Sequence, residues 1–144
     1  MYLVSACLAG VNCRYDGKNS ENKIVAELVK QGKAIPVCPE QLGGLPTPRA
    51  SCEIVMDEKG NIKILTKEEK DCTNEFAKGA EETLKIAKSN GIKKAILKSK
   101  SPSCGCGFIY DGTFSGKLIE GRGLTAGLLM ENGIEVFTEN DFEK

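Results

Sequence analysis

The amino-acid sequence predicts an α/β fold: a Rossmann-like parallel sheet of about four strands with helices on both faces. Short apolar runs of strand length alternate along the chain with amphipathic segments of helical spacing. The length of 144 residues suits one domain, and neither an internal repeat nor a low-complexity tract interrupts the pattern. We therefore expect residues 1–144 to form a single domain, with hairpins as excursions from the sheet.

The N-terminal segment predicts a strand, a loop and a helix. Tyr2–Ala6 has the composition of a short buried strand, and Leu8–Ser20 is polar and Gly-rich like a loop. Ser20 is the predicted N-cap of the helix, and Gly32 stands where a residue following a helix often lies. Its apolar stripe consists of Ile24, Val25, Leu28 and Val29.

The next segment predicts a strand at the edge of the sheet and a hairpin. Ala34–Val37 is strand-like, and Pro36 favours an edge position because proline cannot donate a hydrogen bond to a central ladder. Cys38–Ala50 is a predicted loop. Glu53–Leu65 contains two β-prone runs around a turn-forming stretch, which is typical of a hairpin.

A long amphipathic helix is expected next. Thr66 and Glu69 form a capping-box pattern, which predicts a helix from there to about Ser89, before Asn90 and Gly91. Its apolar stripe consists of Cys72, Phe76, Ala80, Leu84 and Ala87, so the sequence predicts a buried Cys72.

The C-terminal part completes the α/β alternation. Lys94–Leu97 predicts a third strand, Ser99–Gly107 a loop, and Tyr110–Ile119 the centre of a second hairpin. A last helix at about Thr125–Glu131 precedes a strand at Ile134–Phe137. With right-handed crossovers, the predicted strand order in the parallel sheet is 2-1-3-4.

Net charge and hydropathy exclude several partners. The 20 Lys and Arg residues balance the 20 Asp and Glu residues, so no overall positive field favours nucleic acid. The longest apolar stretches, such as Tyr2–Val4 and Ile134–Phe137, are far shorter than the roughly 20 residues of a membrane span. The N-terminus lacks the pattern of a signal peptide. We therefore expect a cytoplasmic protein without membrane contact; the sequence indicates no oligomeric state.

Histidine is absent and cysteine is abundant. Without histidine, a Ser-His-Asp triad, a Cys-His pair and His-ligated zinc are all excluded. Seven cysteines in a chain expected in a reducing compartment indicate a metal, a cluster or reactive thiols, although free cysteine is also a common core residue.

Three of the cysteines follow predicted strands. Cys7, Cys38 and Cys104 come after the first, second and third strands, in loops rich in Gly, Pro and Ser. Because the carboxyl ends of parallel strands meet at one edge of a sheet, we expect these thiols to converge there. Thiolates without imidazoles favour iron–sulfur chemistry, and three of them would leave one iron of a [4Fe-4S] cluster open.

The segments around these cysteines resemble the thiouracil desulfidase (TudS-like) family across nearly the whole chain. The resemblance rests on Ser5–Gly10 with Arg14–Gly17, Pro36–Glu40 with Gly44–Arg49, Lys98–Gly105 and Gly123–Ala126. It implies a single TudS-like desulfidase domain with a [4Fe-4S] cluster on Cys7, Cys38 and Cys104. It also implies that the partner is a small molecule, a thiolated pyrimidine, from which the protein removes sulfur as hydrosulfide without net redox change.

A carboxylate is the natural general base in a chain without histidine. Glu40, two residues after Cys38, is our candidate for taking a proton from the attacking water and returning one to the ring nitrogen. Ser101 is the candidate for orienting the substrate or the proton transfer, and Ser103 is the less favoured hydroxyl.

Other candidate residues surround these motifs. Arg14, Arg49 and Asp16 are candidates for binding the substrate, although surface arginines and turn-forming aspartates are common. We expect Cys13 and Cys106 to lie near the cluster without ligating it.

Two other functions stay open at this point. A non-catalytic iron–sulfur or sulfur-carrier module would use a fourth cysteine as ligand and leave no place for a substrate. A metal-free thiol sulfurtransferase acting on tRNA is disfavoured by the zero net charge, because RNA binding usually leaves a basic footprint.

Overall fold

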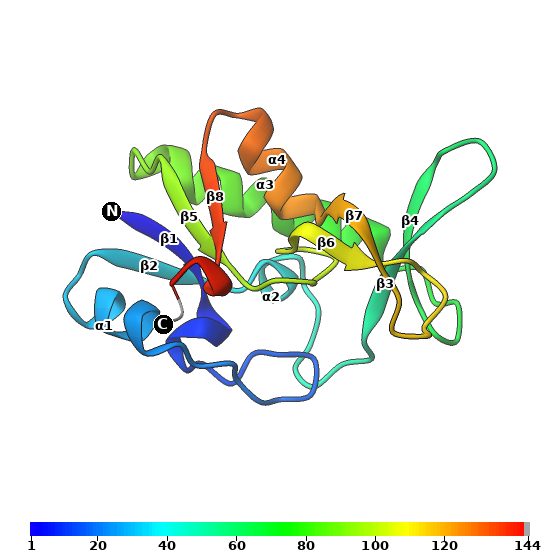
Figure 1. Cartoon of the computed structure of the whole chain (residues 1–144), viewed down its shortest axis with the longest axis horizontal. Helices are drawn as coiled ribbons and strands as arrows, with labels where there is room; N and C mark the ends of the chain where they lie inside the picture. The colour runs from blue at the N-terminus through cyan, green and yellow to red at the C-terminus, as the bar shows by residue number, and fades with distance from the viewer. Residues whose placement is uncertain (143–144) are drawn as a thin grey trace.

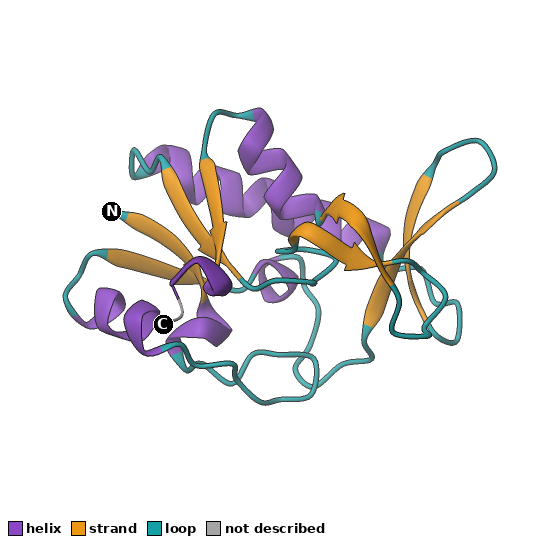
Figure 2. Ribbon diagram, viewed as in Figure 1, coloured by secondary structure: helices purple, strands orange, loops and turns teal. Residues whose placement is uncertain are grey.

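The computed structural model describes residues 1–142 and contains a parallel sheet of four strands in the order β2-β1-β5-β8. The strands are β1 (Tyr2–Ser5), β2 (Ala34–Val37), β5 (Lys94–Leu97) and β8 (Glu135–Thr138), fanned side by side in Figures 1 and 2. This order confirms the predicted 2-1-3-4 arrangement, with β2 and its Pro36 at an edge.

Helices cover both faces of the sheet, as predicted (Figure 2). On one face, α1 (Lys23–Lys30) packs Val25 against the side chains of Val4 and Ile96. On the other, α3 (Thr73–Ser89) and α4 (Leu124–Glu131) pack against Leu3 and Leu97. Successive strand side chains point to opposite faces, so each strand contributes to two cores. Within residues 1–142, no helix has the length and apolar character needed to cross a membrane.

The N-cap of helix α1 lies two residues after the predicted one. The side chain of Asn22 accepts hydrogen bonds from the amides of Ile24 and Val25 at 3.0 and 3.1 Å, so Asn22 is the N-cap. The predicted cap, Ser20, instead accepts a hydrogen bond from Arg14 at 3.1 Å. Gly32 follows the helix with a φ of +69°, as predicted.

Both predicted hairpins are present beside the parallel sheet (Figure 1). One consists of β3 (Cys52–Met56) and β4 (Ile62–Thr66), and the other of β6 (Cys106–Tyr110) and β7 (Leu118–Arg122). Each pair is antiparallel and forms its own two-stranded sheet.

Helix α3 starts at Thr73, so the predicted capping box at Thr66 is wrong. Thr66 ends β4, where it pairs with Cys52, and its hydroxyl accepts the amide of Lys70 in a turn. Glu69 adopts a left-handed φ of 67°, which no residue inside a helix has. The predicted burial of Cys72 is correct, although Cys72 precedes the helix as its cap residue.

A short helix that the sequence pattern did not predict, α2 (Pro39–Leu42), follows β2 and carries Glu40. It crosses α3 at two glycines. A Cβ on Gly43 would lie 1.9 Å from the carbonyl oxygen of Glu75, and one on Gly79 would lie 2.0 Å from that of Pro39. The two backbones are therefore in direct contact, which only residues without a side chain permit. This contact fixes α2 against the long helix. Two 3-10 turns complete the chain, η1 (Ala6–Ala9) and η2 (Glu139–Phe142).

We expect Gly79→Ala to destabilise the fold. The new methyl group collides with backbone rather than with a movable side chain, so the free energy of unfolding should fall by about 1–3 kcal/mol in urea titrations. Gly127→Ala in α4 is the matched control, because its Cβ would approach no atom closer than 4.0 Å. Removing that helical glycine should raise stability by up to about 1 kcal/mol. Equal behaviour of the two variants would contradict the proposed backbone contact.

Candidate functional site

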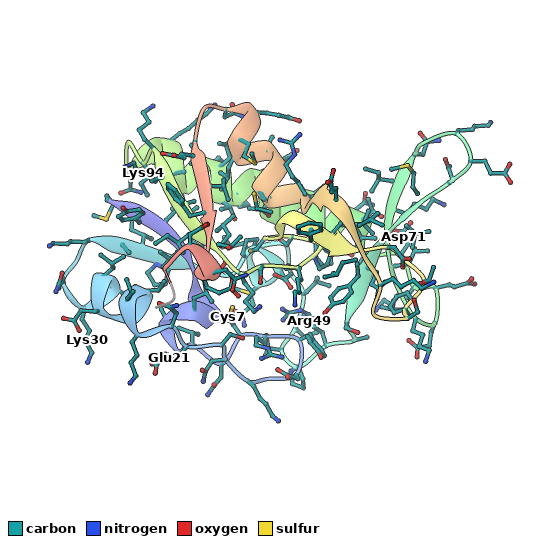
Figure 3. All side chains as sticks on the ribbon, viewed as in Figure 1. Cys7, Glu21, Lys30, Arg49, Asp71 and Lys94 are labelled. Atoms are coloured by element: carbon teal, nitrogen blue, oxygen red, sulfur yellow. The ribbon has the colours of Figure 1, made fainter. Side chains whose placement is uncertain are left out.

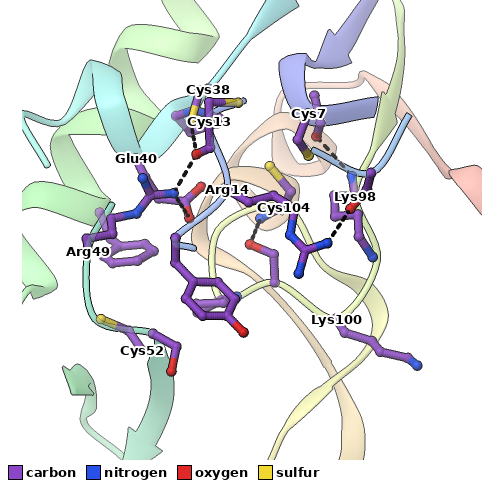
Figure 4. A pocket seen from close by; sticks show the side chains of 18 of the residues that line it. Cys7, Cys13, Arg14, Cys38, Glu40, Arg49, Cys52, Lys98, Lys100 and Cys104 are labelled. Atoms are coloured by element: carbon purple, nitrogen blue, oxygen red, sulfur yellow. Dashed lines mark hydrogen bonds and ion pairs between the residues drawn. The ribbon is translucent and has the colours of Figure 1, made fainter. Parts of the chain in front are cut away.

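A cavity of about 500 Å³ opens at the carboxyl edge of the parallel sheet. Its wall combines the segments that follow β1, β2 and β5 with residues of β3 and β6. Figure 3 shows Cys7 and Arg49 on the side of the molecule where this cavity lies, and Figure 4 shows its lining side chains. The volume is within the range of roughly 300–1,000 Å³ that is usual for small-molecule sites.

The structure brings Cys7, Cys38 and Cys104 to this one cavity. Cys7 lies in η1 after β1, Cys38 directly follows β2, and Cys104 lies in the loop after β5. Cys13 is a fourth thiol in the wall, and the Cys38 thiol donates to the carbonyl oxygen of Cys13 at 3.7 Å (Figure 4). Cys106 does not line the cavity, whereas Cys52, at the start of β3, does.

The surroundings raise the pKa of three thiols in the wall, those of Cys13, Cys38 and Cys104. The hydrogen bond with Cys13, burial and the charge of Glu40 all raise the pKa of Cys38. Burial, followed by the charge of Glu40, raises the pKa of Cys104. For Cys13, the hydrogen bond with Cys38 lowers the pKa, but the hydrogen bond with Cys7 and burial outweigh it and raise the pKa to about 11. A bound metal would replace these protons, because metals bind thiolates.

The thiols are distributed over the wall of the cavity. Among residues 1–142, no group of three or more His, Cys, Asp or Glu side chains is placed to hold a single metal ion. The cavity wall instead offers sulfur donors from separate loops around a volume of about 500 Å³. Such a donor set fits a multi-atom iron–sulfur group better than a lone zinc ion.

Glu40 also lines the cavity, and a buried arginine holds its carboxylate. An Arg49 Nη donates to Glu40 Oε2 at 3.0 Å, and the same nitrogen donates to the carbonyl oxygen of Cys13 at 3.0 Å. Only 7% of the Arg49 side chain is exposed. The other Nη of Arg49 reaches Thr47 at 3.0 Å and the carbonyl oxygen of Pro46. Arg49 therefore fixes the carboxylate to the loop that carries Cys13.

Of the two predicted serines, only Ser101 reaches the cavity. Its hydroxyl oxygen accepts the amides of Ser103 and Cys104, both at 3.0 Å, which leaves its O–H free to donate. Ser103 is buried and shares a 2.8 Å hydrogen bond with Thr125 of α4. The structure therefore places the Ser103 side chain in the core and not in the cavity wall.

Arg14 lines the cavity, but Asp16 does not. Arg14 pairs with Asp16 at 3.1 Å and stands 5.9 Å from the centre of the Tyr15 ring. The carboxylate of Asp16 also accepts the amide of Lys18, as in an Asx turn. In this structure Asp16 thus shapes the loop and orients Arg14.

Glu53, Lys98 and Tyr110 are among the polar residues of the wall that sequence reasoning missed. Glu53 accepts the amides of Gly112 and Phe114 at 3.0 and 3.2 Å, which attaches β3 to the β6–β7 loop. Of these three residues, Lys98 alone could have been found from the sequence, because it begins the motif segment that contains Ser101 and Cys104.

The buried carboxylate of Glu139 lies outside the cavity wall and contacts two residues of it, Lys98 and Ser99. Glu139, at the start of η2, accepts the amide and the hydroxyl of Ser99 at 2.8 and 3.0 Å and pairs with Lys98 at 2.9 Å. Burial alone would raise the pKa of Glu139, but the hydrogen bonds from Lys98 and Ser99 outweigh it, and the pKa lies below its ordinary value. The folded state therefore favours the ionised carboxylate.

Sequence and structure comparisons find one protein family for this chain. Residues 2–141 match the family model described as 2-thiouracil desulfurase. The protein YbbK of Bacillus subtilis (strain 168) is 46% identical over 146 residues, covering 98% of this chain and 97% of YbbK. The solved structure of a [4Fe-4S]-dependent thiouracil desulfidase, TudS, superposes with a TM-score of 0.88 at 42% identity. That match covers 97% of this chain and 91% of the TudS chain.

The lowered pKa of Glu139 predicts how stability depends on pH. The ionised carboxylate stabilises the fold above its unfolded-state pKa of about 4.3, and this contribution is lost as the pH falls through the lower folded-state pKa. The difference in unfolding free energy between wild type and Glu139→Gln should therefore be largest at pH 7 and shrink below about pH 4. Urea titrations measure it, with the exposed Glu135→Gln as control. A difference independent of pH would rule out the ionised form as the stabilising one.

Proposed function

This chain belongs to the 2-thiouracil desulfurase family, and we propose that it converts a thiolated pyrimidine and water into the oxo-pyrimidine and hydrosulfide with a [4Fe-4S] cluster as cofactor. One oxygen replaces one sulfur on the ring, so no electrons are gained or lost. The observation that carries this proposal is the cavity itself, in which thiols from three strand ends face a carboxylate held by a buried arginine.

Cys7, Cys38 and Cys104 are the proposed ligands. Support comes from their positions in three separate loops of the cavity wall and from a donor set that suits iron–sulfur chemistry. When bound, the cluster supplies Lewis acidity and affinity for sulfur at an iron without a protein ligand. Cys13 is the proposed non-ligand, and its carbonyl oxygen orients both the Cys38 thiol and Arg49.

Glu40 is the proposed general base. A carboxylate in the cavity wall can take a proton from the water that attacks the ring carbon and return it to the ring nitrogen as the C–S bond breaks. The Arg49 ion pair holds one carboxylate oxygen, Oε2, whereas Oε1 accepts no hydrogen bond from the residues that the structure describes. The chain thereby orients the base before the substrate arrives, which lowers the cost of reaching the reactive geometry.

Ser101 and Arg14 are the proposed substrate contacts. The Ser101 oxygen is occupied by two amide donors, so its O–H is free to donate to an acceptor on the pyrimidine ring. Arg14 lies in the same wall and offers a guanidinium to a ring oxygen or nitrogen. Arg49 has the different role of holding Glu40.

A non-catalytic iron–sulfur carrier is the second candidate, and one observation favours it. Cys13 lines the same cavity as the three proposed ligands, so a fourth thiol is at hand. Ligation by Cys13 would saturate the cluster and leave no iron for a substrate.

The test is purification without oxygen, followed by addition of 2-thiouracil or 4-thiouracil. We expect brown protein with about four irons per chain. We also expect release of sulfide and the oxo-pyrimidine in equal amounts. Cys38→Ser should lose the iron and the activity, whereas Cys13→Ser should keep the iron. Colourless protein that still releases sulfide would overturn the proposed cofactor, and brown protein without turnover would favour the carrier.

Glu40→Gln tests the base. The amide keeps the size of the side chain but cannot accept the proton, so kcat should fall by about 10²–10⁴-fold. The iron content and the visible absorption should stay at wild-type levels, which separates lost chemistry from lost cofactor. Glu120→Gln, an exposed carboxylate on β7, is the matched control and should leave kcat unchanged. Full activity of Glu40→Gln would reject the assignment.

A further inference from the structure

We propose that Glu139 is a positioning residue for the reaction: it holds the cavity loop, defined as residues 98–104, in the conformation that presents Ser101 and Cys104 to the cavity. Glu139 does not line the cavity and acts from behind it. The catalytic consequence rests on the proposed function, whereas the conformational claim stands without it.

The contacts of Glu139 bridge distant parts of the chain. Its carboxylate reaches back 40 positions to accept both the amide and the hydroxyl of Ser99, and it pairs with Lys98 at 2.9 Å. The residue is only 8% exposed, so solvent screens these contacts weakly. Both oxygens of the carboxylate are used, which fixes the position of Ser99 as well as its orientation.

The residue that follows Ser99 has a strained backbone. Lys100 adopts a φ of +68°, in the left-handed region that side chains disfavour. Such a conformation persists only where the surrounding contacts impose it, and it is enriched at functional sites. It makes the turn after which the Ser101 hydroxyl accepts the amides of Ser103 and Cys104.

The cavity loop is anchored on both sides of this turn. Its C-terminal half is bound to α4, where the amides of Leu124 and Thr125 donate to the carbonyl oxygens of Pro102 and Ser103 at 2.9 Å. At its start, the amide of Lys98 donates to the hydroxyl of Ser5 at 2.9 Å.

Within residues 1–142, the side chains that contact Ser99, the residue next to the strained position, are those of Glu139 and of Lys98, which Glu139 itself holds. Without the carboxylate, Ser99 loses its acceptor next to the strained position, where the backbone bridge between Lys100 and Ile109 remains, and Lys98 loses its ion-pair partner. The loop should then populate other conformations, in which Ser101 and Cys104 no longer face the cavity together.

Hydrogen exchange of the full-length chain tests the conformational claim, in cluster-loaded and metal-free samples. We expect Glu139→Gln to speed exchange of the Ser99, Ser103 and Cys104 amides several-fold in the metal-free protein, with exchange in β1 unchanged. The control is Glu135→Gln, an exposed glutamate on the preceding strand, which should alter neither. Unchanged exchange across the cavity loop in Glu139→Gln would overturn the proposal.

A second variant distinguishes positioning from a general loss of stability. Glycine adopts the left-handed conformation without strain, so Lys100→Gly added to Glu139→Gln should slow exchange of the loop back toward wild type by roughly five-fold. If Glu139 contributed only to overall stability, Lys100→Gly would not slow the exchange of the loop amides. Unchanged exchange in the double variant would therefore contradict the argument from strain.

Kinetics of the loaded enzyme test the catalytic consequence. Glu139→Gln should lower kcat more than it changes KM, and Glu139→Asp should restore part of kcat. If wild type itself releases no sulfide, the proposed function fails while the exchange result still decides the role of Glu139. Wild-type kcat in Glu139→Gln together with faster exchange would overturn the positioning role.

Discussion

The site depends on one constraint, the parallel alignment of four strands whose carboxyl ends lie at one edge of the sheet. The last residues of neighbouring strands are paired, Ser5 with Val37 and Leu97 with Thr138. The chain leaves β1 toward α1 on one face and returns to β5 from α3 on the other. A crevice opens where the connections diverge in this way, and the thiols line it. Residues nearly 100 positions apart thus share one cavity wall.

Close packing between backbone segments fixes the position of the loops that form the cavity wall. The contact between Gly43 and α3 and the contact between Gly79 and α2 hold the segment with Cys38 and Glu40. Likewise, a Cβ on Gly123 would lie 2.4 Å from the carbonyl oxygen of Ser103, so the cavity loop lies directly against the start of α4. Glycine is required in such places because any side chain would separate the two backbones.

Buried ion pairs then orient the polar groups. Arg49 holds Glu40 from one side of the cavity, and Glu139 holds Lys98 and Ser99 from another. Within the part of the chain that the structure describes, every buried side-chain nitrogen or oxygen has a hydrogen-bond partner. Removing one partner of either pair would leave the other charge buried without compensation.

Regular elements were predictable because their signals are local. Apolar periodicity located the strands and both hairpins, and Pro36 placed β2 at an edge. Helix starts were less predictable, because the candidate caps near α1 and α3 have several possible partners. Ser20 binds Arg14 rather than capping α1, and Thr66 is retained in β4 by its pairing with Cys52. In both cases a contact outside the helix decided the position of its first turn.

Composition and periodicity were enough to predict the α/β class and the strand order, and they indicated a chemistry of thiols and carboxylates, because such patterns need no knowledge of distant contacts. Which side chains face the cavity follows from the folded chain alone. The tertiary structure directed Ser103 toward Thr125 and Asp16 toward Arg14, and it brought Cys13 into the wall. It also placed Glu139 behind Ser99, across 40 positions. The physical reason is that side-chain direction follows from contacts between elements far apart in the chain, whereas secondary structure is set largely by neighbours.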